Sequence, residues 1–281
     1  MLTQEQADYL LPKAYNAALR AGAAILEVYA ADGDDYGVTM KSDHTPLTEA
    51  DNRAHNIIKD YLGRTHVPLL SEEGREMLYC ERRGWDMFWM VDPLDGTKEF
   101  IKGNGEFTVN IALMVDNRPA LAVVYVPYIG RIYFAVHGKG AFLRENVLAE
   151  EDAEYSIDEI MGGGRSLPLA QDAARPFRAA ISRSHNTPET FAVLDAMRAV
   201  HPDMEVMEQG SSYKFCLLAE GAVDYYIRTT PTMEWDTAAG ELILEQAGGS
   251  VLSYPDRLPL AYNKESLVNP NFECKSHACG L

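Results

Sequence analysis

The chain has 281 residues, 47% of them hydrophobic and 24% charged, which is an ordinary composition for a globular protein with a large core. Its formal net charge of −17 argues against nucleic acid or an anionic membrane surface as the main partner, because like charges repel. A small phosphorylated substrate stays compatible with this charge, since bound cations and a few basic side chains can reverse the sign at one site.

The first predicted element is a long amphipathic helix from about residue 4 to residue 30. Apolar residues recur along it at helical spacing, beginning with Ala7, Leu10 and Leu11, and we expect it to cover one face of a sheet. A second helix is predicted to begin after Thr48, whose hydroxyl suits an N-cap. Both helices precede the first strand-like runs.

Two apolar runs then end at acidic residues. Residues 67–70 run into Ser71-Glu72-Glu73, and the predicted strand 87–91 ends at Asp92. The β-rich runs that follow are separated by turn signals, which predicts an antiparallel meander. These runs are 108–115, 120–126, 131–136 and 141–143.

The stretch 149–176 is acidic and then glycine-rich, and we expect it to be the loosest connection in the chain. We place a boundary here, between a first half (1–148) and a second half (149–281). The second half alternates strands and helices, with no internal repeat. Its predicted elements are 178–182 (strand), 188–200 (helix), 204–207 (strand), 211–219 (helix), 223–228 (strand), 236–247 (helix) and a strand from Ser250. The fold class is therefore a layered α/β sandwich.

The lack of targeting signals and the pattern of cysteines predict a cytoplasmic protein. The sequence has no run of about 18 apolar residues and no basic and apolar signal segment at its start. The four cysteines are scattered, which suits reduced thiols. Cys274, His277 and Cys279 lack a fourth metal ligand, so we interpret them as an ordinary tail. Weak peripheral association with the inner membrane stays open.

Acidic residues stand where apolar strands stop or helices start: Glu72, Asp92 with Asp95, and Asp236, with Asp51 on the second helix as a further candidate. Each one alone is explained by a helix cap or a solvated carboxylate. Together they predict a metal site, because strand ends of an α/β sheet meet at one edge, where gathered carboxylates need cations. Oxygen donors of this kind suit Mg²⁺ bound together with a substrate phosphate.

Three motifs carry a resemblance to a known family: Ser71-Glu72-Glu73, Asp92-Pro93-Leu94-Asp95-Gly96-Thr97, and Trp235-Asp236-Thr237-Ala238-Ala239-Gly240. With these motifs the chain resembles the lithium-sensitive, Mg²⁺-dependent phosphatases of the inositol monophosphatase superfamily over nearly its whole length. The resemblance implies an αβαβα sandwich, with a metal-binding catalytic first half and a substrate-specifying second half. It also implies two or three Mg²⁺ ions per site.

Within the superfamily the chain is most similar to the bacterial 3′(2′),5′-bisphosphate nucleotidases. The similar stretches are 98–102, 104–110, 182–185, 210–216 and 265–270. The resemblance implies hydrolysis of adenosine 3′,5′-bisphosphate to AMP and phosphate in sulfur assimilation, with the sulfated form, 3′-phosphoadenylyl sulfate, as a second candidate substrate. Two alternatives stay open, an inositol-1-monophosphatase and a non-catalytic, metal-dependent nucleotide-binding regulator. A homodimer is one candidate for the oligomeric state.

The resemblance also implies residue roles. The metal ligands would be Glu72, Asp92, Asp95, Asp236 and the carbonyl oxygen of Leu94, with Asp92 bridging two ions. Thr97, backed by Asp51, would orient and deprotonate the attacking water, with Glu72 also in the catalytic set. The substrate side would comprise Gly96, Thr97 and Asp236 at the phosphate, Ser182 and His185 at the nucleoside, and Ser211, Lys214 and Arg228 at the 5′ phosphate. Glu73 is expected behind the metal ligands, and Lys98 is either a charge balancer or a substrate contact.

Overall fold

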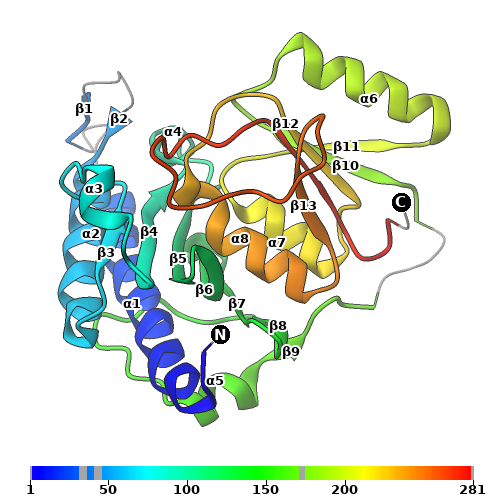
Figure 1. Cartoon of the computed structure of the whole chain (residues 1–281). Coiled ribbons are helices and arrows are strands. Elements are labelled where there is room, and N and C mark those ends of the chain that lie inside the picture. Colours follow the sequence, from blue (N-terminus) through cyan, green and yellow to red (C-terminus); the bar gives the residue numbers. More distant parts are fainter. Residues whose placement is uncertain (1, 32–36, 41–45, 171–174, 280–281) are drawn as a thin grey trace.

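The computed structural model describes residues 2–31, 37–40, 46–170 and 175–279 of the chain. Helices and sheets alternate in five layers, which confirms the predicted sandwich (Figure 1). No helix within these described ranges is long and apolar enough to cross a membrane.

The first layer consists of α1 (Gln4–Ala30) and α2 (Glu49–Leu62), which lie side by side. Both begin at a threonine with a capping box, Thr3 for α1 and Thr48 for α2, so the N-cap expected at Thr48 is confirmed. Near them lie β1 (Thr39–Met40), β2 (Pro46–Leu47), the short helix η1 (Gly63–Thr65) and α3 (Tyr79–Arg82).

The second layer is a seven-stranded sheet in the order β3-β4-β5-β6-β7-β8-β9. Its strands are β3 (Leu69–Ser71), β4 (Met87–Asp95), β5 (Thr108–Val115), β6 (Arg118–Val126), β7 (Arg131–Val136), β8 (Gly140–Arg144) and β9 (Arg165–Ser166). Strands β3 and β4 are parallel, whereas β4 to β8 form the predicted antiparallel meander. The pairing of β4 with β5 shifts between Asp92 and Asp95, so the acidic turn distorts the end of β4.

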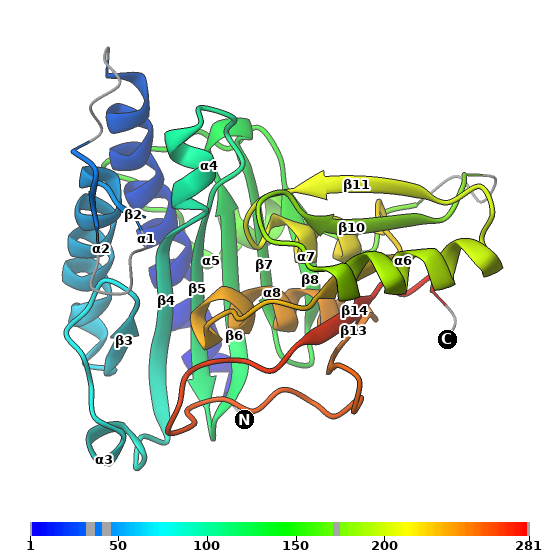
Figure 2. The ribbon, with the colours of Figure 1, turned by 90° about the horizontal axis from the view of Figure 1, so that it is seen from above.

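The third layer, α7 (Tyr213–Glu220) and α8 (Glu234–Gln246), covers the other face of this sheet (Figure 2). Beyond it lies a five-stranded sheet in the order β11-β10-β12-β14-β13, followed by the outer helix α6 (Pro188–Val200). The strands of this sheet are β10 (Arg178–Ser182), β11 (Glu205–Gln209), β12 (Tyr225–Arg228), β13 (Ser250–Ser253) and β14 (Phe272–Lys275).

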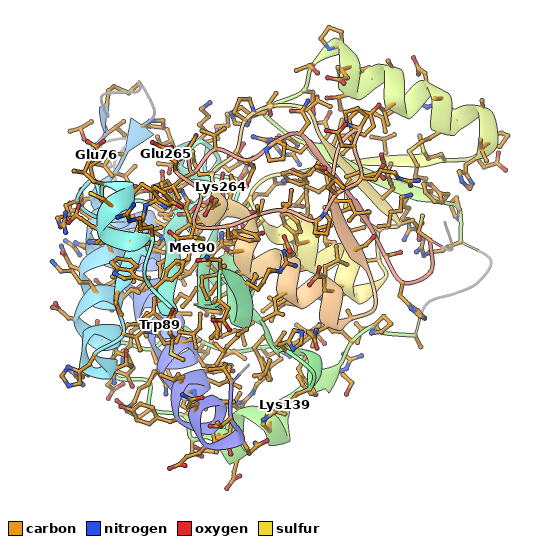
Figure 3. All side chains as sticks on the ribbon, in the orientation of Figure 1. Glu76, Trp89, Met90, Lys139, Lys264 and Glu265 are labelled. Carbon is orange, nitrogen blue, oxygen red and sulfur yellow. The ribbon has the colours of Figure 1, made fainter. Side chains whose placement is uncertain are left out.

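Two large apolar cores lie on opposite faces of the first sheet, because successive strand residues point to opposite sides. Trp89 belongs to the core under α1 and α2, and its neighbour Met90 belongs to the core under α7 and α8 (Figure 3). This second core joins the two sheets through α7 and α8, so the halves are packed together at the helices that flank the site.

Three segments differ from the sequence-based expectation. The connection 149–176 contains α5 (Ile157–Gly163), capped by Ser156, and β9, which pairs with β8 in the first sheet. A short helix, η2 (Pro127–Ile129), occupies one predicted turn. The chain end was expected to be a plain tail, but β14 forms there with Cys274 buried. The division of the chain near residue 148 stays a prediction.

Candidate active site

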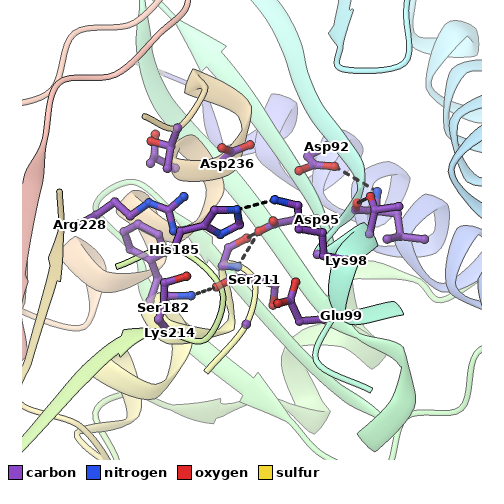
Figure 4. A pocket seen from close by; sticks show the side chains of 18 of the residues that line it. Asp92, Asp95, Lys98, Glu99, Ser182, His185, Ser211, Lys214, Arg228 and Asp236 are labelled. Carbon is purple, nitrogen blue, oxygen red and sulfur yellow. Dashed lines mark hydrogen bonds between the residues drawn. The ribbon is translucent and has the colours of Figure 1, made fainter. Parts of the chain in front are cut away.

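A pocket opens where the end of β4 meets the first turns of α4 (Thr97–Ile101), α7 and α8. Asp92 and Asp236 lie along one side of the pocket and Arg228 and Lys214 lie on another, whereas Lys98 extends from beside Asp95 toward His185 (Figure 4). Every residue predicted for the site lines this pocket except Asp51, which lies behind Thr97. The predicted residues that line it are Glu72, Asp92, Leu94, Asp95, Gly96, Thr97, Ser182, His185, Ser211, Lys214, Arg228 and Asp236.

Three carboxylates converge on the acidic side. Oxygens of Glu72, Asp92 and Asp236 all lie within 4.8 Å of one another, and no other such group of acidic, histidine or cysteine residues occurs in the described part of the chain. Asp236 sits in the first turn of α8, where it accepts the Met233 N–H at 2.8 Å, so it caps the helix and also faces the cluster. Asp236 is therefore both a helix-capping residue and a member of the carboxylate cluster.

The buried carboxyl groups of the cluster have raised pKa values. Burial raises the pKa of Asp92 well above its usual range, and the charges of Glu72 and Asp95 raise it further. Burial likewise raises the pKa of Asp236, with Asp95 and Glu72 as the next causes. Buried like charges are stable together only with protons or with a cation among them. The donor set is all oxygen, so these residues fit a hard divalent cation.

Asp95 lies in the pocket but outside this trio. Its Oδ2 atom accepts the Ser212 backbone N–H at 2.6 Å and the Ser212 hydroxyl, and the Asn110 amide donates to the same oxygen at 3.4 Å. Asn110 also donates to the Ser212 hydroxyl at 2.6 Å. The second half therefore reaches the acidic turn through Ser212. This role of Ser212 is not predicted from the sequence, although Ser212 lies in one of the family-like stretches, 210–216.

Thr97 and Asp51 are paired, as the sequence analysis expected. The Thr97 hydroxyl donates to Asp51 Oδ1 at 3.0 Å, and Leu94 O lies 3.4 Å from the same hydroxyl. Asp51 is only 1% exposed, and its other oxygen accepts the Thr48 N–H at 2.7 Å and the Thr48 hydroxyl at 2.5 Å. The capping box of α2 thus fixes the carboxylate that faces Thr97.

Gly96 is required by its surroundings. Its φ of +99° is one that residues with a side chain rarely adopt, and an added Cβ would lie 2.9 Å from the carbonyl oxygen of Glu106. This turn starts α4 directly at Thr97. The role of the Gly96 and Thr97 amides at a phosphate stays a prediction.

His185 and Lys98 meet across the pocket, with Lys98 Nζ 2.8 Å from His185 Nε2 (Figure 4). Burial, together with the charges of Arg228, Lys98 and Lys214, lowers the pKa of His185 to about 4. His185 is therefore neutral at pH 7, and its Nε2 atom accepts a hydrogen bond from Lys98. Three basic groups thus surround one neutral imidazole.

Lys214 is 3% exposed and donates to Gln209 O at 3.0 Å and to Ser211 O at 2.5 Å. Its ammonium also lies 5.2 Å from the centre of the Tyr226 ring. Burial lowers the pKa of Lys214 to about 8, and the charge of Arg228 contributes in the same direction. The lysine therefore fixes the turn before α7 as well as lining the pocket.

Some predicted neighbours lie elsewhere. Glu73 is half-buried and is not among the residues that line the pocket. Phe88 and Trp89 are fully buried in the two cores, and Trp85 packs against Phe88, so these aromatic residues near the acidic turn belong to the core packing.

The chain matches known proteins both in sequence and in structure. The model of the inositol monophosphatase family matches residues 6–279. The 3′(2′),5′-bisphosphate nucleotidase CysQ of Escherichia coli (strain K12) is 41% identical over 271 residues, covering 94% of this chain and 98% of that protein. The crystal structure of CysQ from Bacteroides thetaiotaomicron matches with a TM-score of 0.88 and 46% identity, covering 96% of this chain and 98% of the other. The SuhB protein of Bartonella henselae, at 23% identity and a TM-score of 0.71 with 96% and 94% covered, shares the fold.

Proposed function

The chain belongs to the inositol monophosphatase family, and on this premise we propose that it is a Mg²⁺-dependent 3′(2′),5′-bisphosphate nucleotidase. It is a phosphoric monoester hydrolase that converts adenosine 3′,5′-bisphosphate to AMP and phosphate. We place this activity in the cytoplasm, in the removal of the nucleotide by-product of sulfur assimilation. The sulfated form of the nucleotide is a second candidate substrate.

The observation that carries the proposal is the opposite charge of the two sides of the pocket. Glu72, Asp92 and Asp236 gather on one side, whereas Lys214 and Arg228 line the other. A nucleotide bisphosphate has two separate anionic groups, so it can occupy the metal side with one and the basic side with the other. An inositol monophosphate would leave the basic side without a counter-charge, which favours the nucleotide.

The residues that would hold two or three Mg²⁺ ions are Glu72, Asp92, Asp95 and Asp236, with the carbonyl oxygen of Leu94. Bound ions of this kind lower the pKa of a water molecule and neutralise charge on the phosphoryl oxygens. Glu72, directly after β3, and Asp92, in β4, are held next to each other because the two strands are adjacent and parallel, and the Glu72 N–H donates to Val91 O at 3.1 Å. Ser212 does the same for Asp95 by donating two hydrogen bonds to its carboxylate.

Thr97 and Asp51 handle the proton of the attacking water. The water oxygen forms the new bond to phosphorus while the bond from phosphorus to the 3′ oxygen breaks. Thr97 Oγ1 accepts a proton from the water as it passes its own proton to Asp51 Oδ1, 3.0 Å away. A threonine hydroxyl alone is a weak base, so the buried carboxylate is essential to this step. The departing 3′ oxygen takes up a proton from solvent water and becomes the nucleoside hydroxyl, and Asp51 later returns its proton to solvent.

The second half selects the substrate. Lys214, Arg228 and Ser211 would contact the 5′ phosphate, and Ser182 and His185 would contact the nucleoside. Because His185 is neutral at pH 7, it can hydrogen-bond an uncharged ribose or base without attracting a further anion. The substrate is thus recognised by charge at its two ends and by neutral groups between them.

Phosphate release from adenosine 3′,5′-bisphosphate tests the proposal. We expect release with Mg²⁺, none with excess EDTA, inhibition by lithium, and none from Asp95→Asn with Mg²⁺. Calorimetry on Thr97→Ala should show the nucleotide still bound, because Lys214 and Arg228, which are proposed to bind the second phosphate, are unchanged. A wild-type chain that binds the nucleotide without releasing phosphate would instead be a regulator and would contradict the enzyme assignment.

A further inference from the structure

A cluster of polar contacts joins the segment after the acidic turn to two loops of the second half. We call this cluster the clasp; it consists of Glu99, Lys102, Glu106, Arg183 and Ser184. Its centre is a two-pronged ion pair, with Arg183 Nε and Nη2 each donating to one Glu106 oxygen at 2.7 Å. Such paired geometry gives stronger and more directional bonding than a single contact.

The clasp holds both loops at once. Arg183 and Ser184 lie in the loop after β10, where the Ser184 hydroxyl donates to Glu99 at 2.5 Å and accepts from Lys102 at 2.8 Å. Glu106 also accepts the backbone N–H of Gly210 at 2.8 Å, which ties down the turn before α7. One carboxylate therefore connects the metal-side segment to two separate parts of the second half.

Close packing supports these hydrogen bonds. A Cβ added at Gly210 would lie 2.7 Å from Glu99 Cγ and 2.9 Å from the Glu106 carbonyl oxygen, so the absent side chain allows the backbone to approach. The Glu106 side chain is 18% exposed and that of Arg183 is 35% exposed. The ion pair is therefore partly shielded from water, and solvent screens it less than an ordinary surface pair.

The two clasped loops carry pocket residues. Ser182 is the last residue of β10 and His185 lies in the loop after it, and the turn before α7 includes Ser211 and Ser212. Figure 4 shows Glu99 at the edge of the pocket, across from Ser182 and Lys214. The clasp thus lies directly behind the groups proposed to contact the nucleoside and the second phosphate.

We propose that Glu106 and Arg183 are positioning residues that set the preference for a substrate with a second phosphate. This inference rests on the proposed function, because it concerns how the basic side is held relative to the acidic side. Both ends of a bisphosphate fit only if the two sides keep a fixed separation, and small misplacements weaken binding or slow the reaction. A monoester engages the acidic side alone, so it is less sensitive to that separation.

The test compares Arg183→Ala with wild type on adenosine 3′,5′-bisphosphate and on adenosine 3′-monophosphate. We expect the ratio of the two KM values, bisphosphate over monoester, to rise roughly tenfold, as for the loss of one hydrogen-bonded ion pair. Arg183→Lys keeps the charge, so its KM ratio should lie between that of the wild type and that of Arg183→Ala. The bond from Gly210 to Glu106 stays in place in both variants, so the acidic side keeps its support.

A matched control lies at the opposite end of β10. Arg178, at the start of β10, donates to Glu205 at 2.8 Å in an ion pair that also links β10 with β11. Arg178→Ala removes an ion pair of the same type away from the pocket and should leave the KM ratio unchanged. Melting temperatures of all variants report on folding.

A second variant, Glu106→Gln, keeps an acceptor for Gly210 but loses the charge that holds Arg183. Combined with Arg183→Ala it should raise the KM ratio no further than Arg183→Ala alone, because the pair between Arg183 and Glu106 is already lost in the single variant. The bond from Arg183 to Glu208 O and the ion pair with the Glu208 carboxylate are lost in both Arg183→Ala chains, so they cancel in this comparison. An unchanged ratio in Arg183→Ala, an equal change in Arg178→Ala, or an equal fall of kcat for both substrates would overturn the inference. A wild-type chain with no preference for the bisphosphate would instead overturn the proposed function.

Discussion

Replacing Asp92 with asparagine should stabilise the metal-free protein and abolish its activity. At 4.8 Å, and with an effective dielectric constant of about 20, two unit charges in the Glu72, Asp92 and Asp236 cluster repel by about 3.5 kcal/mol. Protonation already relieves part of this repulsion, since burial raises the pKa of Asp92. We therefore expect the amide to add about 1–2 kcal/mol to the free energy of unfolding. Its oxygen can still accept the Leu94 N–H that Asp92 accepts at 3.1 Å.

The assay is thermal unfolding in EDTA and in Mg²⁺. For a chain of this size the expected gain corresponds to a Tm about 3–6 °C higher for Asp92→Asn in EDTA. Mg²⁺ should raise the Tm of the wild type and leave that of the variant nearly unchanged. Asp86→Asn, which removes the same charge at the exposed start of β4, should shift the Tm by about 1 °C or less. An equal or lower Tm for Asp92→Asn in EDTA, or an undiminished response to Mg²⁺, would refute the reasoning.

Three further outcomes are expected. Thr97→Ala should lower kcat about 10²- to 10⁴-fold with little change in KM, measured by steady-state phosphate release, and a KM effect alone would contradict its role at the water. The KM for the bisphosphate should rise by up to about tenfold per pH unit above pH 8, because Lys214, whose pKa is lowered to about 8, then loses the charge that binds the second phosphate. Adenosine 3′-monophosphate should lack this rise. Gly240→Ala should lower the free energy of unfolding in urea by about 1–3 kcal/mol, because its Cβ would lie 2.6 Å from the Phe215 ring. Gly162→Ala, with nothing within 4 Å, should not be destabilising.

Much of the fold could be predicted because its signals are local. Helical spacing gave α1 and the threonine cap gave α2, and turn residues separated the strands of the meander. Helix α5 was missed because the glycines at 162–164 indicate a loop. The capping box formed by Ser156 and Glu159 is the signal that could have located it. Strand β14 was missed although its four residues, Phe272 to Lys275, alternate between apolar and polar, because so short a run is a weak strand signal. The burial of Glu273 and Lys275 depends on tertiary packing and leaves no mark in the sequence.

The site, like the fold, was predicted only where short local motifs mark it. The acidic motifs and the Thr97–Asp51 pair were expected from short motifs that resemble a family. The bond between Ser212 and Asp95 joins residues 117 positions apart, and the ion pair between Arg183 and Glu106 joins residues 77 positions apart. Neither pair has a periodicity or a turn that relates its members in one sequence. Such contacts depend on how the two halves pack, which local patterns do not encode.

The most direct test of the central claim is the ratio of kcat/KM for adenosine 3′,5′-bisphosphate to that for inositol-1-phosphate, measured with Mg²⁺ under one set of conditions. A charged hydrogen bond at the second phosphate should favour the nucleotide by roughly ten- to a hundredfold or more. Equal or better turnover of inositol-1-phosphate would contradict the nucleotidase assignment.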